Sequence, residues 1–268
     1  MELLTLDGVA LKADGPTLTL SVRSGEAVAI MGPTRSGKSA LMRVAAGRER
    51  PARGRVTAAT ECAVASEGMG RRARVASIAK ETGHPKANDL LVALGLWEVR
   101  NESLGDLALG HRAALGLLSP LLSSASLIAI DGELDFLDPW AHAAAWEALR
   151  VARSRGAGVI IVTDRPETAA ACDTVVVVRN RQVSFAGTVE TLRRLGPPHE
   201  LTVTTERQAG VRALVSPFEI SIHEIPEGLR LEAKDGQELA ARLLKEGYGD
   251  VKFVVSRPPT LEEGLLGL

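Results

Sequence analysis

A glycine-rich segment at residues 32–39 carries the strongest chemical signal in the chain. It reads Gly-Pro-Thr-Arg-Ser-Gly-Lys-Ser and fits the pattern G-x-x-x-x-G-K-[ST]. Gly32 and Gly37 allow a tight turn whose backbone amides can surround a phosphate chain. Lys38 can then reach the outer phosphates, and the Ser39 hydroxyl can bind Mg²⁺. The predicted phosphate-binding residues are Gly32, Pro33, Thr34, Arg35, Ser36, Gly37, Lys38, Ser39 and Ala40.

An aspartate at the end of an apolar run supplies the second half of such a site. Residues 127–131 read Leu-Ile-Ala-Ile-Asp, and a short continuous apolar run is typical of a strand buried on both faces. Asp131 would lie at the carboxyl end of that strand, where its carboxylate can reach Mg²⁺ through water. Because the phosphate loop precedes it, the pair predicts a Mg²⁺–nucleotide site with Ser39 and Asp131 on the metal.

Strands and helices that could position these residues alternate along the first 196 residues. Besides 127–131, apolar or alternating segments predict strands at 3–6, 18–22, 27–31, 159–162 and 175–178. Helices are predicted at 38–47, 111–122, 139–153 and 166–171. This order predicts an α/β fold with a parallel sheet between helices. Together with the phosphate loop it resembles a P-loop NTPase (RecA-like) core with antiparallel strands at its N-terminal end.

The residues from 197 onward follow a different pattern and predict a second, small α+β domain at 197–268. After Pro197-Pro198, strands are expected at 201–205, 218–223, 229–233 and 251–255, with helices at 206–214 and 236–245. The order βαββαβ is that of a ferredoxin-like module, and a short helix at 260–268 follows it. Asp235 and Glu238 have the spacing of a capping box for the second helix.

Composition excludes several classes of function. The chain has 32 Lys and Arg against 33 Asp and Glu, so its net charge of -1 gives no electrostatic basis for nucleic-acid binding. Two cysteines cannot form a disulfide framework. No apolar run is long enough to span a membrane, and the N-terminus lacks the features of a signal peptide. We therefore expect a cytoplasmic protein whose contact with a membrane depends on a partner.

Taken together, these motifs resemble those of the ATP-binding subunits of ABC transporters. The phosphate loop, the Asp131 strand and Leu137-Asp138-Pro139 follow the family's order, and Leu107-Ala-Leu-Gly-His111 stands at its signature motif. The tail at 258–263 resembles that of exporter-type subunits, which carry a similar small C-terminal domain. The resemblance implies ATP and Mg²⁺ as cofactors, head-to-tail dimers that hold ATP between the phosphate loop of one subunit and the signature of the other, and an integral membrane permease as partner.

Two departures from the family concern hydrolysis. Gly132 stands where the family has its catalytic glutamate, directly after Asp131. Glu133 is one residue further on, and continued strand geometry would turn its side chain to the opposite face, although it stays open as a substitute base. Asp164 stands at the position of the switch histidine, where a carboxylate would repel a γ-phosphate instead of donating to it.

Other departures concern binding contacts. The signature serine and the glycine after it are replaced by Ala108 and Leu109, so that only Gly110 is retained. No glutamine lies near residues 78–81, the region expected to form the Q-loop, where Lys80 is the best candidate for its place. Residues 7–14 contain no aromatic side chain that could stack on adenine. The helical subdomain, expected at about 82–122, is short for the family.

These observations predict a subunit that binds Mg–ATP but hydrolyses it weakly. Loss of general-base assistance typically costs about 10²–10⁴ in rate, whereas the phosphate loop, Ser39 and Asp131 are present. We expect such a chain to pair with a competent second ATPase subunit, although a homodimer stays open. Through the permease it would lie on the inner face of the cell membrane.

Two other classes of protein remain as alternatives. A non-transport ABC-type regulator or scaffold would share every motif named above, and would differ in that it does not co-purify with an integral membrane protein. An unrelated P-loop kinase or GTPase is the other alternative. The chain contains no Asn-Lys-x-Asp motif for guanine and no evident lid for a second substrate, which argues against both enzymes.

Overall fold

The protein is described by a computed structural model that covers residues 1–58, 61–66, 69–70, 72–247 and 249–268. The chain forms two compact units, Met1–Val189 and Glu190–Leu268. The sequence predicted the division at residue 196. It falls earlier because α7 (Val189–Arg193) packs against α10 (Leu261–Leu266) near the C-terminus: a Cβ at Gly264 would lie 2.3 Å from the carbonyl oxygen of Leu192.

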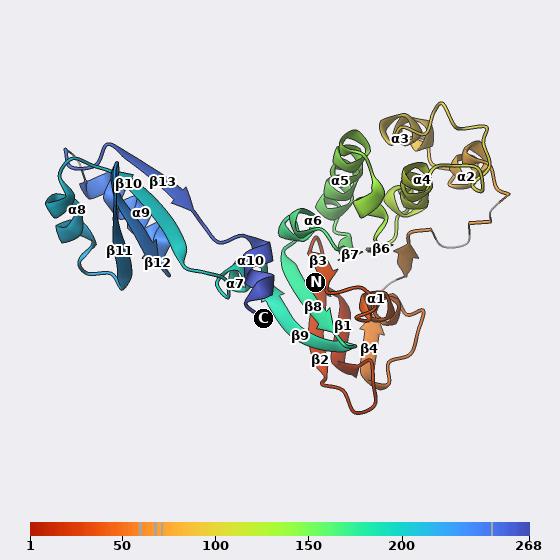
Figure 1. Ribbon diagram of the computed structural model, residues 1–268. Helices are drawn as coiled ribbons and strands as arrows, with labels where there is room; N and C mark the ends of the chain where they lie inside the picture. The colour runs from red at the N-terminus through yellow and green to blue at the C-terminus, as the bar shows by residue number, and fades with distance from the viewer. Residues whose placement is uncertain (59–60, 67–68, 71, 248) are drawn as a thin grey trace. The chain divides into compact units, whose positions relative to one another are not determined.

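A six-stranded sheet forms the centre of the first unit, in the order β5-β6-β7-β3-β8-β9 (Figure 1). All neighbours are parallel except β8 and β9. The strands are β3 (Ala27–Met31), β5 (Cys62–Val64), β6 (Leu127–Asp131), β7 (Gly158–Val162), β8 (Thr174–Arg179) and β9 (Gln182–Thr188). Val162 pairs with both Ile30 and Asp131, so β3, β6 and β7 end at the same edge. The parallel sheet predicted from the apolar runs is confirmed.

An antiparallel sheet of three strands, ordered β2-β1-β4, contributes to the same core. Its strands are β1 (Glu2–Ala10), β2 (Leu18–Arg23) and β4 (Arg53–Ala58). Leu4 and Leu6 of β1 join Val28 and Ile30 of β3 and Leu41 in one buried cluster. The first two strands were predicted from their alternation, whereas β4 was not, because its side chains are almost all exposed.

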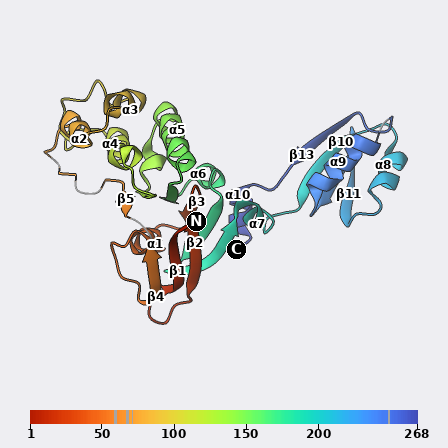
Figure 2. The same ribbon diagram turned by 180° about the vertical axis from the view of Figure 1, so that it is seen from behind.

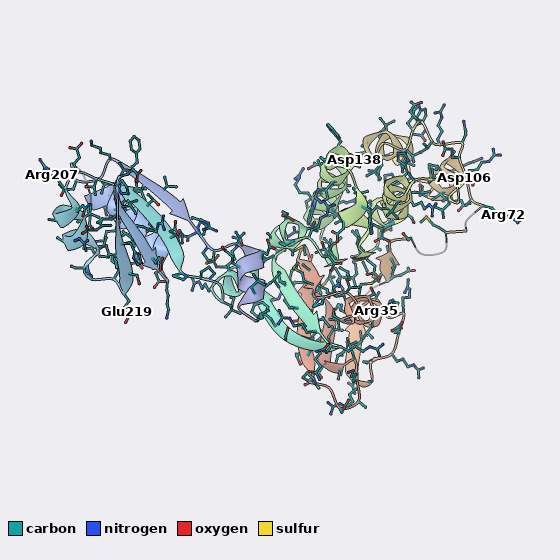
Figure 3. The ribbon with its side chains drawn as sticks, viewed as in Figure 1. Arg35, Arg72, Asp106, Asp138, Arg207 and Glu219 are labelled. Carbon is teal, nitrogen blue, oxygen red and sulfur yellow. The ribbon has the colours of Figure 1, made fainter. Side chains whose placement is uncertain are left out.

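Helices complete the first unit. α1 (Lys38–Ala45) follows the phosphate loop, and α5 (Pro139–Ser154) and α6 (Pro166–Ala170) flank β7 in the chain. Asp138 caps α5, since its Oδ1 accepts from the amides of Trp140 and Ala141 at 2.9 Å each (Figure 3). The helical subdomain is formed by α2 (Val75–Glu81), α3 (Ala87–Ala93) and α4 (Leu109–Leu122), so it starts before the expected residue 82. In the described residues, no helix is long and apolar enough to span a bilayer.

The second unit contains a four-stranded antiparallel sheet ordered β11-β12-β10-β13, with α8 and α9 beside it (Figure 2). Its elements are β10 (His199–Thr204), α8 (Gln208–Val215), β11 (Ile220–Ile225), β12 (Gly228–Ala233), α9 (Gly236–Glu246) and β13 (Phe253–Arg257). Both helices cover the sheet face that carries Leu201 and Val203. The predicted βαββαβ order and the ferredoxin-like strand arrangement are therefore confirmed.

The predicted capping box at α9 is wrong. Asp235 has φ -102° and ψ 52°, outside the extended region that a capping side chain needs, and it makes no capping hydrogen bond. A capping box forms instead at α10. There the Thr260 hydroxyl accepts from the Glu263 amide at 3.1 Å, and the Glu263 carboxylate accepts from the Thr260 amide at 2.8 Å.

Among the described residues of the second unit, His199 is the buried titratable one. Only 6% of it is exposed, its Nε2 lies 2.7 Å from the Ser256 hydroxyl, and its ring packs against Gly236 at the start of α9. Burial lowers the pKa of His199, and the charge of Glu190 only partly opposes this. Because the folded state disfavours the protonated ring, stability is complete above the unfolded pKa of about 6.5 and falls as the pH drops below it.

We therefore predict that β10 becomes easier to open between pH 7.5 and pH 5.5. The measurement is hydrogen exchange of residues 199–204 by mass spectrometry, corrected for the intrinsic effect of pH. His199→Gln should reduce the pH dependence. His223→Gln is the control, since His223 is exposed on β11, the edge strand on the other side of β12, and it should leave the dependence unchanged. An equal response in wild type and His199→Gln would contradict the assignment.

Candidate nucleotide site

The phosphate loop joins β3 to α1 and closes tightly against β8. Gly32 has φ +143°, and a Cβ there would lie 1.9 Å from the Val178 carbonyl oxygen. Only glycine fits such an approach. Gly37, with φ +109°, ends the loop where α1 begins. The first amides of α1 have no partner within the helix, so they are available to an anion.

Ser36 lies inside the loop. Its amide donates to the Pro33 carbonyl at 3.0 Å, and its carbonyl accepts from the Arg181 amide at 2.6 Å. Its hydroxyl is buried and has no hydrogen-bond partner among the described residues. A buried hydroxyl without a partner is costly in a finished structure, so this atom fits a loop that is completed by a polar ligand such as a phosphate.

Lys38 carries the main positive charge of the loop and is 9% exposed. Its Nζ donates to the carbonyl oxygens of Gly32 at 2.7 Å and Pro33 at 3.0 Å. The same atom lies 3.0 Å from Oδ1 of Asp164, which follows β7. Asp164 therefore acts as an internal counter-ion of Lys38, and an anion that binds Lys38 must compete with it.

Ser39 and Asp131 meet, as their proposed metal role requires. The Ser39 hydroxyl donates to Oδ1 of Asp131 at 2.9 Å. The contact forms because β6 and β3 both pair with β7 and end at the same edge of the sheet, where the phosphate loop follows β3. A hydroxyl and a carboxylate are hard oxygen ligands of the kind that Mg²⁺ takes alongside phosphate and water, so the pair fits that metal.

The chain leaves the strand directly after Asp131, which corrects the expectation for Glu133. Gly132 has φ +91°, and residues Glu133–Phe136 form the 3-10 helix η1, so strand alternation does not continue. Glu133 is 9% exposed and folds back toward the strand end. Its Oε2 accepts from the Asp131 amide and its Oε1 from the Ser66 hydroxyl, both at 2.8 Å. Both carboxylate oxygens therefore hold the turn in place.

Asp135 is a further acidic residue of the turn, and sequence reasoning missed it. Its Oδ1 accepts from the Thr163 hydroxyl at 2.6 Å, and its Oδ2 accepts from the Asp164 amide at 2.8 Å. It thus fixes the segment that carries Asp164 against Lys38. The sequence feature that could have identified Asp135 is its position four residues after Asp131.

The expectation that Lys80 takes the place of the Q-loop glutamine stays a prediction. Lys80 is exposed in the last turn of α2. The residue that the edge strand β5 brings to Glu133 is Ser66, the second residue after the strand. β5 has only three residues, so its apolar pattern was too short to identify in the sequence.

The three signature residues lie at the start of α4. Ala108 is its N-terminal flanking residue and forms no side-chain cap, which a serine there could supply. Leu109 is 59% exposed, and Gly110 lies against the Phe136 carbonyl of η1. In the described part of the chain, no hydrogen bond or ion pair joins these residues to the phosphate loop.

Comparison with known proteins identifies this arrangement. Residues 16–133 match a family model described as ABC transporter. This segment, which makes up most of the first unit, belongs to an ABC transporter ATP-binding domain. A solved structure titled as the ATP binding subunit of an ABC transporter has the same fold as this domain, with a TM-score of 0.62, 22% identity, and coverage of 72% of this chain and 92% of that one.

Two curated relatives are also ABC ATP-binding proteins. The chain is 26% identical to the Nod factor export ATP-binding protein I of Rhizobium leguminosarum bv. viciae, over 94% of this chain and 88% of that protein. It is 28% identical to the zinc import ATP-binding protein ZnuC of Paramagnetospirillum magneticum, over 72% of this chain and 80% of that protein.

For this ATP-binding domain, we predict that Asp164→Asn strengthens binding of Mg–ATP. The change removes the counter-ion of Lys38 and a negative charge that opposes the γ-phosphate. The exposed fraction of the Asp164 side chain is 64%, so the effect is modest, about two- to tenfold in Kd. Isothermal titration calorimetry measures it. Glu167→Gln on α6 removes an exposed charge nearby and should change Kd less than twofold. Weaker binding by Asp164→Asn would contradict the prediction.

We further predict that Glu133→Gln lowers the free energy of unfolding by about 1–3 kcal/mol, because an acceptor of two hydrogen bonds is replaced. The residual ATPase rate should not change. Chemical denaturation and a phosphate-release assay measure the two effects. Glu147→Gln on α5 is the control, since it removes only a surface ion pair with Arg150. Loss of the residual rate in a folded Glu133→Gln chain would show instead that Glu133 is the base.

Proposed function

We propose that the chain is the ATP-binding subunit of an ABC membrane exporter, and that it binds Mg–ATP firmly but hydrolyses it slowly. The observation that carries the second part is the turn after Asp131. Gly132 has no carboxylate, and both oxygens of Glu133 are already hydrogen-bonded. A general base must reach the attacking water with a free carboxylate oxygen, and neither residue supplies one in this conformation.

The binding contacts support the first part of the proposal. The loop amides, Lys38 and the Ser36 hydroxyl would surround the phosphates, while Ser39 and Asp131 would hold Mg²⁺. When bound, Mg²⁺ neutralises charge on the phosphate oxygens. The missing base raises the barrier to hydrolysis by roughly 3–5 kcal/mol, without removing any of these contacts. ATP would therefore stay in the site.

A second ATPase subunit would complete the assembly. The segment around the signature exposes large apolar side chains: Leu109 is 59% exposed, Phe136 53% and Trp140 81%. Apolar side chains that stand so far out are typical of a surface that another protein covers. A homodimer would contain two sites without a general base. A partner with a complete site would give the dimer one site that hydrolyses ATP fast enough to drive transport.

The direction of transport is proposed from the relatives. The rhizobial relative, which is named for export, aligns over 94% of this chain, whereas the relative named for zinc import aligns over 72%. The longer alignment extends into the C-terminal part of the chain, which supports an exporter. The subunit would then act at the inner face of the membrane, where it would bind an integral permease.

We predict that the purified chain binds Mg–ATP through Lys38 and turns it over at near-background rates. Lys38→Ala should reduce affinity at least tenfold, since it removes the charge that faces the phosphates. Lys12→Ala, an exposed lysine between β1 and β2, should have no effect. Equilibrium binding and steady-state phosphate release measure both. Robust turnover by the chain alone would overturn the proposed weak hydrolysis, and absence of binding would overturn the nucleotide site.

A further inference from the structure

Two neighbouring cavities meet at the phosphate loop. The first has a volume of about 360 Å³ and is lined by residues 35–40 of the loop and α1, together with Arg43 and Arg181. The second, of about 310 Å³, is lined on one side by Leu11 and Pro51. Ala40, Arg43 and Arg181 line both cavities. A nucleotide whose phosphates lie in the loop must extend its ribose and base outward, and the second cavity adjoins the first along these three residues.

The residues that line the two cavities include no aromatic side chain. A nucleobase in the second cavity therefore needs another flat partner. A guanidinium is planar and stacks on aromatic faces. Arg43 is already engaged, because its Nε donates to the Glu49 carboxylate. Within the described residues, the Arg181 side chain makes no ion pair or hydrogen bond, so its guanidinium is available to a ligand.

The backbone holds Arg181 at this position at a conformational cost. Asn180 and Arg181 connect β8 to β9 with φ +51° and +60°. In a two-residue hairpin with both φ positive, the second residue is usually glycine. Non-glycine residues with positive φ are strained and gather at functional sites. The Arg181 amide donates to the Ser36 carbonyl at 2.6 Å, which fixes the turn against the phosphate loop.

The first atoms of the Arg181 side chain lie against the phosphate loop. A Cβ built at Gly37 would lie 3.2 Å from Cγ of Arg181 and 3.4 Å from Cδ1 of Leu11. Arg181 and Leu11 thus both lie against the residue at which α1 begins. Arg181 offers a flat cation and Leu11 an apolar surface, and both kinds of group can pack against the flat faces of a nucleobase.

We propose that Arg181 is the residue on which the nucleobase stacks in this site. The proposal rests on the proposed nucleotide-binding function and adds the determinant of base binding to it. Arg35 serves as an internal comparison. It also has positive φ, +63°, and lies beside α1 (Figure 3), but it lines only the cavity at the phosphate loop. Arg35 is therefore placed to meet phosphate, and Arg181 to meet the base.

The test compares Mg–ATP with Mg–tripolyphosphate, which has the phosphates of ATP but no base. Isothermal titration calorimetry on the full chain gives Kd for both. Arg181→Gly should weaken ATP binding about five- to hundredfold, as loss of one base-stacking contact does, and should leave the tripolyphosphate Kd within twofold. Its Tm should equal or exceed that of wild type, because glycine relieves the strained turn.

Two matched variants sharpen the result. Arg35→Gly also replaces a strained arginine by glycine, and should weaken both ligands by the same factor. Arg181→Lys keeps the charge but has no flat group, so it should bind ATP as weakly as Arg181→Gly does.

Three outcomes would overturn the proposal. ATP binding that is unchanged in Arg181→Gly shows that the base lies elsewhere. Equal loss for ATP and tripolyphosphate shows that Arg181 contacts phosphate. Full rescue by lysine shows that charge alone acts. A failure of the proposed function is distinguishable from these, because wild type would then bind neither ligand in a manner dependent on Lys38.

Discussion

The close approach of Gly32 to the β8 backbone is the constraint on which the site depends. With no room for a side chain between Gly32 and Val178, the phosphate loop has one position relative to the sheet. That position places Ser39 beside the end of β6 and Lys38 beside the end of β7. The parallel register then decides the chemistry, since neighbouring strands that end together bring Asp131 and Asp164 to the same loop.

Two acidic residues just after β6 are used to build the turn. Glu133 accepts from the strand end and from Ser66, while Asp135 accepts from Thr163 and Asp164. These contacts join η1 to β5 on one side and to the end of β7 on the other. Carboxylates fixed in this way give a well-defined turn, but they are not free to take a proton from water. These contacts are the physical basis of the proposed combination of firm binding with slow hydrolysis.

Much of the fold could be predicted from the sequence because buried parallel strands leave continuous apolar runs, as β3 and β6 do. Edge strands leave no such mark. β4 is arginine-rich, β5 has three residues and β9 is half exposed, and none of them was predicted.

At the site, the motif residues could be identified from their spacing in the sequence. The contacts that these residues make could not be predicted in this way. The fold-back of Glu133 depends on the left-handed conformation of Gly132, and the pairing of Lys38 with Asp164 depends on β7 lying next to β3. The base-stacking role proposed for Arg181 depends on a hairpin turn that packs on the loop from far along the chain. Strand order and backbone angles of this kind are properties of the folded chain, and no short motif encodes them.

The Lys38–Asp164 pair makes nucleotide binding an ion-exchange reaction. The cation in the loop is already neutralised, and the arriving phosphate replaces one anion with another instead of meeting a bare charge. The observed affinity is then a difference between two attractions to the same ammonium group. Dissolved salt screens both, so its effect on affinity partly cancels. A site of this design keeps its lysine in place between ligands, and its affinity falls less steeply with ionic strength than that of a site with an unpaired lysine.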